Sequence, residues 1–198
     1  MVCSFNTQLL LLPHDYLAFS YILFLAQNTN DADLHIPILV DDTVEHKDVL
    51  VHRSTIRHDV IKIFMDPNIL NCSLDVVVIN ANGNPEPGKG KGVIRDILTH
   101  FWQEFFTAVS TGGDEKTPRI RHDLQKPEWQ AIARIAVYGF KRINYFPIEL
   151  SQLFVISCLF GEESINKEFL LKSFHFYIAP DDQKVLDQLL SKDFDHND

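Results

Sequence analysis

The segment DVVVINANGNPEPGKGKGVIRDILTH, from Asp75 to His100, decides the fold of this chain. Its first residues are apolar and mostly β-branched, which predicts a buried strand over Val76 to Asn80. A loop of Gly, Asn and Pro follows, and apolar residues then recur at helical spacing from Val93 to Val109, which predicts a core helix. The glycines in the loop allow the chain to turn tightly between strand and helix. The segment is therefore a strand-loop-helix unit.

The loop also resembles a nucleotide site, because GNPEPGKG, from Gly83 to Gly90, differs by one residue from the phosphate-binding signature G-x-x-x-x-G-K-[ST]. In a working loop, consecutive backbone N–H groups converge on the phosphate, and a hydroxyl completes the magnesium shell. Pro85 and Pro87 lack an N–H, and Gly90 stands in the place of the hydroxyl residue. We therefore expect no nucleotide or other cofactor here.

The composition excludes several classes of function. With 198 residues, 45% of them hydrophobic, the chain can bury a substantial core. The 27 acidic and 18 basic residues give a net charge of −9, which disfavours binding to nucleic acid. The chain has three cysteines, Cys3, Cys72 and Cys158, which is too few for a disulfide framework, so we expect a reducing, intracellular location, cytoplasmic or nuclear. They form no C-x-x-C motif, so we expect no metal site.

Residues 1–46 are expected to form an N-terminal extension with an apolar helix over Tyr16 to Ala26, a short strand over Ile36 to Val40 and a polar linker between them. Pro13 and the two polar residues after it break the apolar stretch into pieces that are too short for a bilayer of about 30 Å, so no membrane span is expected. The first Lys or Arg is Lys47, so the basic region of a secretion signal is missing.

Residues 47–198 are expected to form an α+β domain that is mainly α-helical. A strand is predicted over Asp48 to Arg53, followed by a helix that Ser54 caps and Pro67 ends. The segment 110–126 is expected to be a loop. Further helices are predicted over 127–142, over 147–160 with Pro147 at its start, and over about 164–178 and 180–190. The helix over 147–160 is apolar nearly all round, so it should be buried on most sides.

Several of these segments, in this order, resemble the N-terminal lobe of HECT-type ubiquitin ligases: VHRS with its helix, DVVVIN, the Gly-rich turn, GVIRDILTHFWQEFF, EWQAIARIAVYGF and YFPIELSQLFVISCLFG. In that family, a strand and a Gly-rich turn precede a helix with an R-E-F-F-like pattern. A later helix carries F-x-x-I-G-R-x-x-x-x-A, and L-P-F-x-x-x-F-x-x-x-L-L-G follows it. The HECT-like domains of transposon-derived animal proteins are the most similar, and the resemblance covers about residues 49–190.

The resemblance implies a function in ubiquitin conjugation. HECT ligases transfer ubiquitin through a thioester on a cysteine of a separate C-terminal lobe, after a ubiquitin-conjugating enzyme has docked on the N-terminal lobe. This chain ends where the N-terminal lobe would be unfinished, so we expect a truncated module that is not catalytic by itself. Cys158 lies among apolar residues of a predicted helix, and no motif places a His partner beside Cys72 or Cys3. No catalytic residue is therefore assigned.

Three functions stay open from the sequence. The chain is a HECT-like protein-binding module, or an excerpt of an active ligase whose catalytic lobe lies outside it, or an unrelated helical interaction domain. The partners that the resemblance implies are a ubiquitin-conjugating enzyme, ubiquitin or a substrate protein. Phe174, Tyr177 and Leu186 are predicted contacts, because they lie where the missing small subdomain would begin.

The remaining polar residues are expected to have structural roles. His52 and His58 are not expected to bind a metal together. The two RHD tripeptides, at 57–59 and 121–123, are expected to form local ion pairs. Asp96 and Glu104 are expected on the solvated face of the helix over 93–109.

Overall fold

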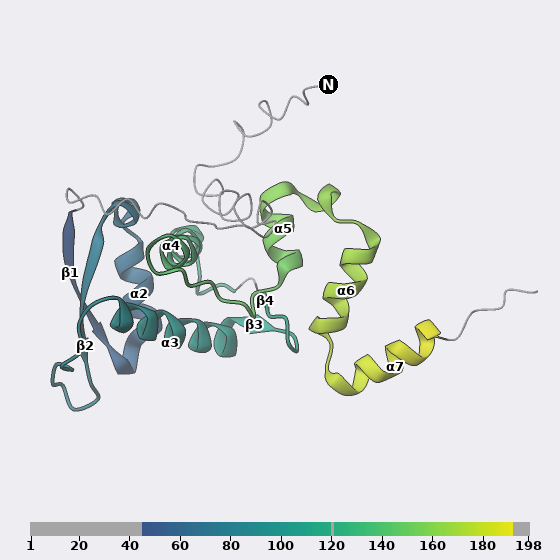
Figure 1. Cartoon of the computed structure of the whole chain (residues 1–198), viewed down its shortest axis with the longest axis horizontal. Coiled ribbons are helices and arrows are strands. Elements are labelled where there is room, and N and C mark those ends of the chain that lie inside the picture. The colour runs from purple at the N-terminus through teal and green to yellow at the C-terminus, as the bar shows by residue number, and fades with distance from the viewer. Residues whose placement is uncertain (1–44, 120, 192–198) are drawn as a thin grey trace, which may run out of the picture. The chain divides into compact units, whose positions relative to one another are not determined.

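A computed structural model describes residues 45–119 and 121–191. The predicted helix over Tyr16 to Ala26, the predicted strand over Ile36 to Val40, and Cys3 lie outside the described residues. The described residues are mostly helical with a few short strands, which confirms the expectation of a mainly helical α+β fold. They form two compact units: residues 45–108 with 121–147, and residues 109–119 with 148–191 (Figure 1).

The first unit contains a two-stranded parallel sheet of β1 (His46–His52) and β2 (Ser73–Ile79). The 3-10 turn η1 (Arg53–Thr55), the helix α2 (Ile56–Phe64) and the 3-10 turn η2 (Pro67–Asn71) connect the strands. Side chains alternate between the two faces of the sheet. Val51 and Val78, which are paired, are buried, whereas the pair Leu50 and Val77 is 51% and 42% exposed on the opposite face. The strand predicted over Val76 to Asn80 exists, but it is buried on one face only.

The start of α2 differs from the prediction. A 3-10 turn precedes the helix, and the residue before its first turn is Thr55, so the predicted cap at Ser54 is wrong. Asp59, in the first turn of α2, instead accepts a hydrogen bond from the backbone N–H of His52 at 2.9 Å. The helix ends at Phe64, and Pro67 begins η2. The side chain of Asp59 in α2 therefore holds the backbone at His52, the last residue of β1.

The helix α3 (Lys91–Val109) is the core helix that the sequence predicts. The predicted apolar positions are buried, with the exception of the half-buried Val93: Ile94, Ile97, Leu98, Phe101, Trp102, Phe105, Phe106 and Val109. Trp129, from α4 (Lys126–Ile143), packs edge-on against Phe105, with ring centroids 6.2 Å apart. The 3.6-residue spacing of the apolar residues thus identifies the buried face of this helix.

The helix α4 holds the first unit together through side chains that cap other elements. Arg134 donates a hydrogen bond to the carbonyl oxygen of Phe64 at the end of α2, at 3.1 Å. The ring of Tyr138 packs edge-on against that of Phe64, with centroids 5.4 Å apart. Because the last carbonyl groups of a helix lack partners within it, the Arg134 bond satisfies one of them.

The second unit contains a short hairpin, β3 (Ser110–Thr111) and β4 (Thr117–Pro118), in the segment that was expected to be a loop. After it come α5 (Gln152–Phe160), the 3-10 turn η3 (Glu162–Ser164), α6 (Lys167–Tyr177) and α7 (Pro180–Ser191). Backbone bonds join the hairpin to the end of α6: Gly113 N–H donates to the carbonyl of Tyr177 at 2.6 Å, and Glu115 N–H to that of Phe176 at 3.1 Å. The hairpin therefore anchors α6.

Two expectations about α5 are wrong. The helix begins at Gln152 rather than at Pro147, and the hydroxyl of Ser151 accepts a hydrogen bond from the backbone N–H of Phe154 at 3.4 Å. Ser is a preferred residue before the first helical turn. Of the side chains described in α5, only that of Val155 is fully buried, and Phe160 is 39% exposed. Although the composition of α5 is apolar, the helix is not buried on most sides.

Candidate functional site

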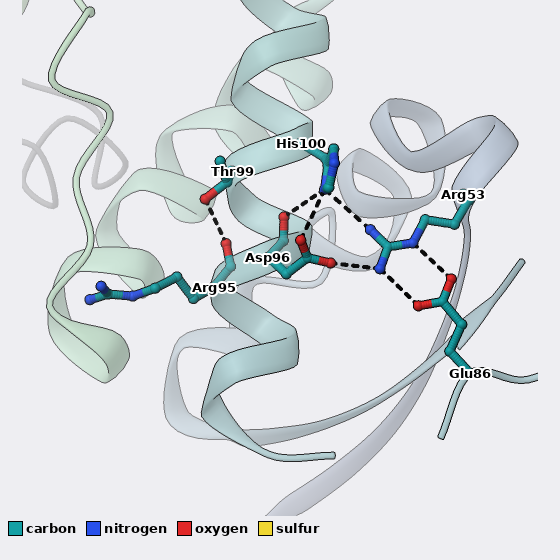
Figure 2. A network of polar contacts seen from close by, with 6 residues as sticks. All are labelled: Arg53, Glu86, Arg95, Asp96, Thr99 and His100. Carbon is teal, nitrogen blue, oxygen red and sulfur yellow. Dashed lines mark hydrogen bonds and ion pairs between the residues drawn. The ribbon is translucent and has the colours of Figure 1, made fainter. Parts of the chain in front are cut away.

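Arg53, the first residue of η1, is the centre of a polar network at the Gly-rich loop (Figure 2). Its Nε and Nη2 donate to the two carboxylate oxygens of Glu86, at 3.0 and 2.8 Å. Nη2 also lies 2.6 Å from Oδ2 of Asp96 on α3. His100, one turn further along α3, has Nδ1 3.2 Å from Nη1 of Arg53. One guanidinium thus connects the end of β1, the loop and the core helix.

Hydrogen bonds within the Gly-rich loop and to β2 also hold the loop in place. The side-chain oxygen of Asn80 accepts from the backbone N–H groups of Asn82 and Asn84, at 2.9 and 3.1 Å. Gly83 has φ +78°, a conformation that side chains other than glycine's rarely adopt. The N–H of Glu86 then donates to the carbonyl of Val78 in β2 at 2.8 Å. These bonds fold the chain back along β2 and place the Glu86 carboxylate at Arg53.

The charge of Arg53 favours the ionised form of Glu86. The hydrogen bonds of Glu86 and Asp96, with their negative charges, raise the pKa of Arg53 against the opposing effect of its partial burial. The Arg53 guanidinium in turn holds the pKa of Glu86 below its usual range. An ionised Glu86 inside the loop would repel a phosphate group, and Lys89, the lysine of the near-signature, is exposed. The geometry therefore fits a structural clamp and gives no support to a nucleotide site.

A second polar cluster surrounds the carboxylate of Asp59. Its Oδ2 accepts from Nδ1 of His52 at 2.8 Å and from the hydroxyl of Thr55 at 3.2 Å, and Oδ1 lies 3.4 Å from Nδ1 of His58. His52 and His58 therefore meet at one acid. Within the described ranges, no group of three His, Cys, Asp or Glu residues could hold a metal ion.

His52 and Asp59 also line an open groove of about 410 Å³ between β1 and α2. Val49, Leu50 and Ile63 supply its apolar lining. Lys47, Lys62 and Asp66 supply further charges, and Lys47 and Asp66 are paired at 2.6 Å.

The two described cysteines lie in protected surroundings. Cys72 is 5% exposed, and its thiol contacts the carbonyl of Asn68 at 3.6 Å. Cys158 on α5 is half-buried rather than fully buried, and burial raises the pKa of its thiol. A thiol reacts as a thiolate, and a raised pKa reduces the thiolate fraction at neutral pH. Neither environment is that of an activated nucleophile.

The predicted partner residues lie on α6 and α7. Phe174 is 46% exposed, Tyr177 is 37% exposed and Leu186 is half-buried. Tyr177 also donates a hydrogen bond from its hydroxyl to that of Thr111 at 3.3 Å. Other large apolar side chains of the same two helices are exposed: Leu170, Leu171, Phe176, Val185 and Leu189. These seven exposed residues are called the α6–α7 apolar surface below.

The roles of several polar side chains do not follow from the local sequence. Asp96 was expected to be merely solvated but binds Arg53. Of the two RHD tripeptides, the second forms the expected local ion pair, with Arg121 Nε 2.7 Å from Asp123 Oδ1. In the first, Asp59 contacts His58 of the same tripeptide at 3.4 Å, and it also binds His52 and Thr55. Arg53 and Glu86 are 33 positions apart, and nothing in the local pattern links them.

Comparison of the chain with models of protein families, with curated proteins and with solved structures finds no match. In the part of the chain that the structure describes, no helix is long and apolar enough to cross a membrane.

Proposed function

We propose that this chain is a HECT-like module that binds a protein of the ubiquitin-conjugation pathway without forming a covalent intermediate. The sequence resemblance supplies the pathway. The observation that carries the binding role is the α6–α7 apolar surface, in which Leu170, Phe174 and Val185 are 46%, 46% and 56% exposed. Exposed apolar residues that gather in a patch commonly mark a site of protein interaction.

The environments of the thiols support a non-covalent role. A thioester relay requires a thiolate that is exposed and able to reach the donor. Cys72 is buried and the pKa of Cys158 is raised, so both described thiols are poor nucleophiles. We therefore expect no reducible ubiquitin adduct when the chain is mixed with activating enzyme, conjugating enzymes and ubiquitin. A dithiothreitol-sensitive adduct that disappears in Cys72→Ala or Cys158→Ala would contradict the proposal.

Binding is tested by titrating the labelled chain with a ubiquitin-conjugating enzyme and, separately, with ubiquitin, and by measuring the affinity of each. The expected result is saturable binding that Phe174→Ala weakens. Ile148→Ala is the matched control, because Ile148 is a large apolar residue of the second unit, 89% exposed and outside α6 and α7. Equal affinities for the wild type and Phe174→Ala would remove α6 from the interface.

Two other functions remain as alternatives. If the reading frame continues into a cysteine-bearing lobe, the chain is an excerpt of an active HECT ligase, and the same surface would belong to that larger enzyme. The other alternative is an unrelated helical interaction domain, which the absence of binding to both the conjugating enzyme and ubiquitin would favour.

A further inference from the structure

The Gly-rich loop contains the one Asn-Gly dipeptide of the chain, Asn82–Gly83. The side-chain amide of an asparagine and the backbone nitrogen of the next residue can close a ring, and glycine in the second position leaves that nitrogen unhindered. Both residues are exposed. Among the described residues, a Cβ added at Gly83 would meet no atom within 4 Å apart from its neighbours in the chain. The dipeptide therefore has both the residue types and the space for a reaction between its own atoms.

The folded loop holds both backbone nitrogens of the dipeptide in hydrogen bonds. The N–H of Gly83 donates to the carbonyl of Asn80 at 3.0 Å, which closes a turn. The side-chain oxygen of Asn80 accepts from the N–H of Asn82 at 2.9 Å and from that of Asn84 at 3.1 Å. Asparagine commonly stabilises turns in this way. Because the Gly83 nitrogen must lose its proton in order to react, the turn restrains the reaction.

We propose that Asn82 is a site of spontaneous deamidation, and that the turn formed by Asn80 controls its rate. The Gly83 nitrogen attacks Cγ of Asn82 and loses its proton, and the side-chain nitrogen of Asn82 takes up a proton and leaves as ammonia. The product is a succinimide ring. Water then opens the ring at either carbonyl, which gives aspartate or isoaspartate. The net reaction consumes water and releases ammonia, without oxidation or reduction.

The two other asparagines of the loop serve as internal controls. Asn84 precedes Pro85, whose nitrogen carries no proton to lose, so this ring closure is blocked. Asn80 precedes Ala81, whose side chain hinders attack by the backbone nitrogen, and the side-chain oxygen of Asn80 is held by two hydrogen bonds. The loop thus places one reactive asparagine between two that are less reactive.

The two products should affect the loop differently. Aspartate keeps the length of the backbone and adds a negative charge. In isoaspartate the backbone passes through the side chain and gains a carbon atom, so the turn between Asn80 and Gly83 no longer fits. Glu86 follows in the same loop, where its N–H bonds the carbonyl of Val78 at 2.8 Å and its carboxylate binds Arg53 (Figure 2). Isoaspartate should therefore loosen the contact between the loop and Arg53.

The test is peptide mapping of the full chain by mass spectrometry after incubation in a mildly alkaline buffer, with fragmentation to assign the acid product to a residue. Acid at Asn82 should accumulate severalfold faster than at Asn80 or Asn84. Asn80→Ala removes the side-chain acceptor and should raise the rate at Asn82 severalfold. Asn80→Asp is the matched control, because it keeps an acceptor oxygen and should leave that rate near the wild-type value. An Asn82 that reacts no faster than Asn80, or equal rates in the two variants, would overturn the proposal.

A second measurement needs no substitution at Asn80. The wild type in concentrated denaturant has lost the turn and should deamidate at Asn82 severalfold faster than the folded wild type. Equal rates in the two states would overturn control by the turn, even if Asn80→Ala fails to fold. Incubated protein that contains isoaspartate should also show faster hydrogen exchange of the Glu86 amide, whereas Asn82→Asp, which adds the charge alone, should not.

Discussion

The backbone N–H of Leu74 in β2 donates a hydrogen bond to the hydroxyl of Tyr138 in α4, at 3.0 Å and out of contact with solvent. The two residues are 64 positions apart. A strand N–H that faces away from β1, the one strand that pairs with β2 among the described residues, would otherwise be buried without an acceptor, which is costly. The Tyr138 hydroxyl therefore supplies the acceptor that a neighbouring strand would otherwise supply, and the bond connects β2 to α4.

Tyr138→Phe should lower the free energy of unfolding by about 1 to 3 kcal/mol, because the ring remains while the Leu74 N–H loses its acceptor. Chemical denaturation measures the change. Tyr145→Phe is the control, since Tyr145 is half-buried and none of the described residues is seen to bond its hydroxyl. Similar losses in both variants would show that the Leu74 bond carries little stability.

The same tyrosine predicts behaviour at alkaline pH. Burial raises the pKa of Tyr138 above 10.0, against the opposing hydrogen bond from Leu74. The unfolded chain therefore loses this proton first, and the contribution to stability is present below about pH 10 and lost above it. The wild type should destabilise more steeply than Tyr138→Phe as the pH rises past 10. Parallel pH profiles would contradict this assignment.

Arg53→Gln should destabilise the first unit and loosen the Gly-rich loop. The substitution removes the guanidinium that lies between Glu86 and Asp96, and leaves two acids without their shared cation. We expect a lower denaturation midpoint and faster hydrogen exchange in residues 80–90. A double-mutant cycle with Glu86→Gln should give a favourable coupling energy. Lys89→Gln, an exposed change in the same loop, should leave both measurements near those of the wild type.

Substitutions of Trp102 distinguish the effect of its packing from the effect of its buried N–H. Its side chain is 2% exposed, and no described residue accepts a hydrogen bond from its buried Nε1. Trp102→Ala should cost about 3 to 5 kcal/mol through loss of packing. Trp102→Phe should cost clearly less, because it keeps most of the ring and removes a buried N–H that has no protein acceptor. Equal melting temperatures for the wild type and Trp102→Ala would show that α3 does not form the core.

The sequence predicts those parts of the fold that depend on local periodicity. Val93 to Val109 repeats apolar residues every three or four positions, so both the helix and its buried face follow from the pattern. Pro147 failed as a helix start because Ser151, four residues later, supplies a side-chain acceptor for the first turn. Proline at a first helical turn is permitted, but a capping oxygen competes with it.

The candidate site depends on contacts between distant residues, which local patterns do not encode. Arg53 finds Glu86 only because β1 and β2 are parallel neighbours and the loop folds back along β2. Glu86 also decides the interpretation of the loop: the sequence excluded a phosphate site from missing donors, and the structure adds an ionised acid held in the loop by Arg53. Calorimetric titration with magnesium and ATP should accordingly give no binding heat. A micromolar site that Lys89→Ala abolishes would overturn this.

Asp59 should make the protein sensitive to acid. Burial disfavours its charge, but the hydrogen bonds from the backbone and ring of His52, with those from His58 and Thr55, outweigh that effect and lower its pKa below 3.8. As the pH falls, the unfolded chain therefore takes up this proton before the folded chain does. The contribution of Asp59 is complete above about pH 5 and is lost as the pH falls through 3.8 and below.

The measurement is the difference in free energy of unfolding between the wild type and Asp59→Asn at a series of pH values. Asp59→Asn should be less stable than the wild type at pH 6, because an amide cannot accept all of the hydrogen bonds that the carboxylate accepts. The difference should shrink as the pH falls from 5 toward 3, because the unfolded wild-type chain takes up the Asp59 proton before the folded chain does. Asp48→Asn, an exposed acid on the adjacent strand, is the control and should show no such convergence. A gap between the wild type and Asp59→Asn that is independent of pH would show that the carboxylate is not charged when it binds His52.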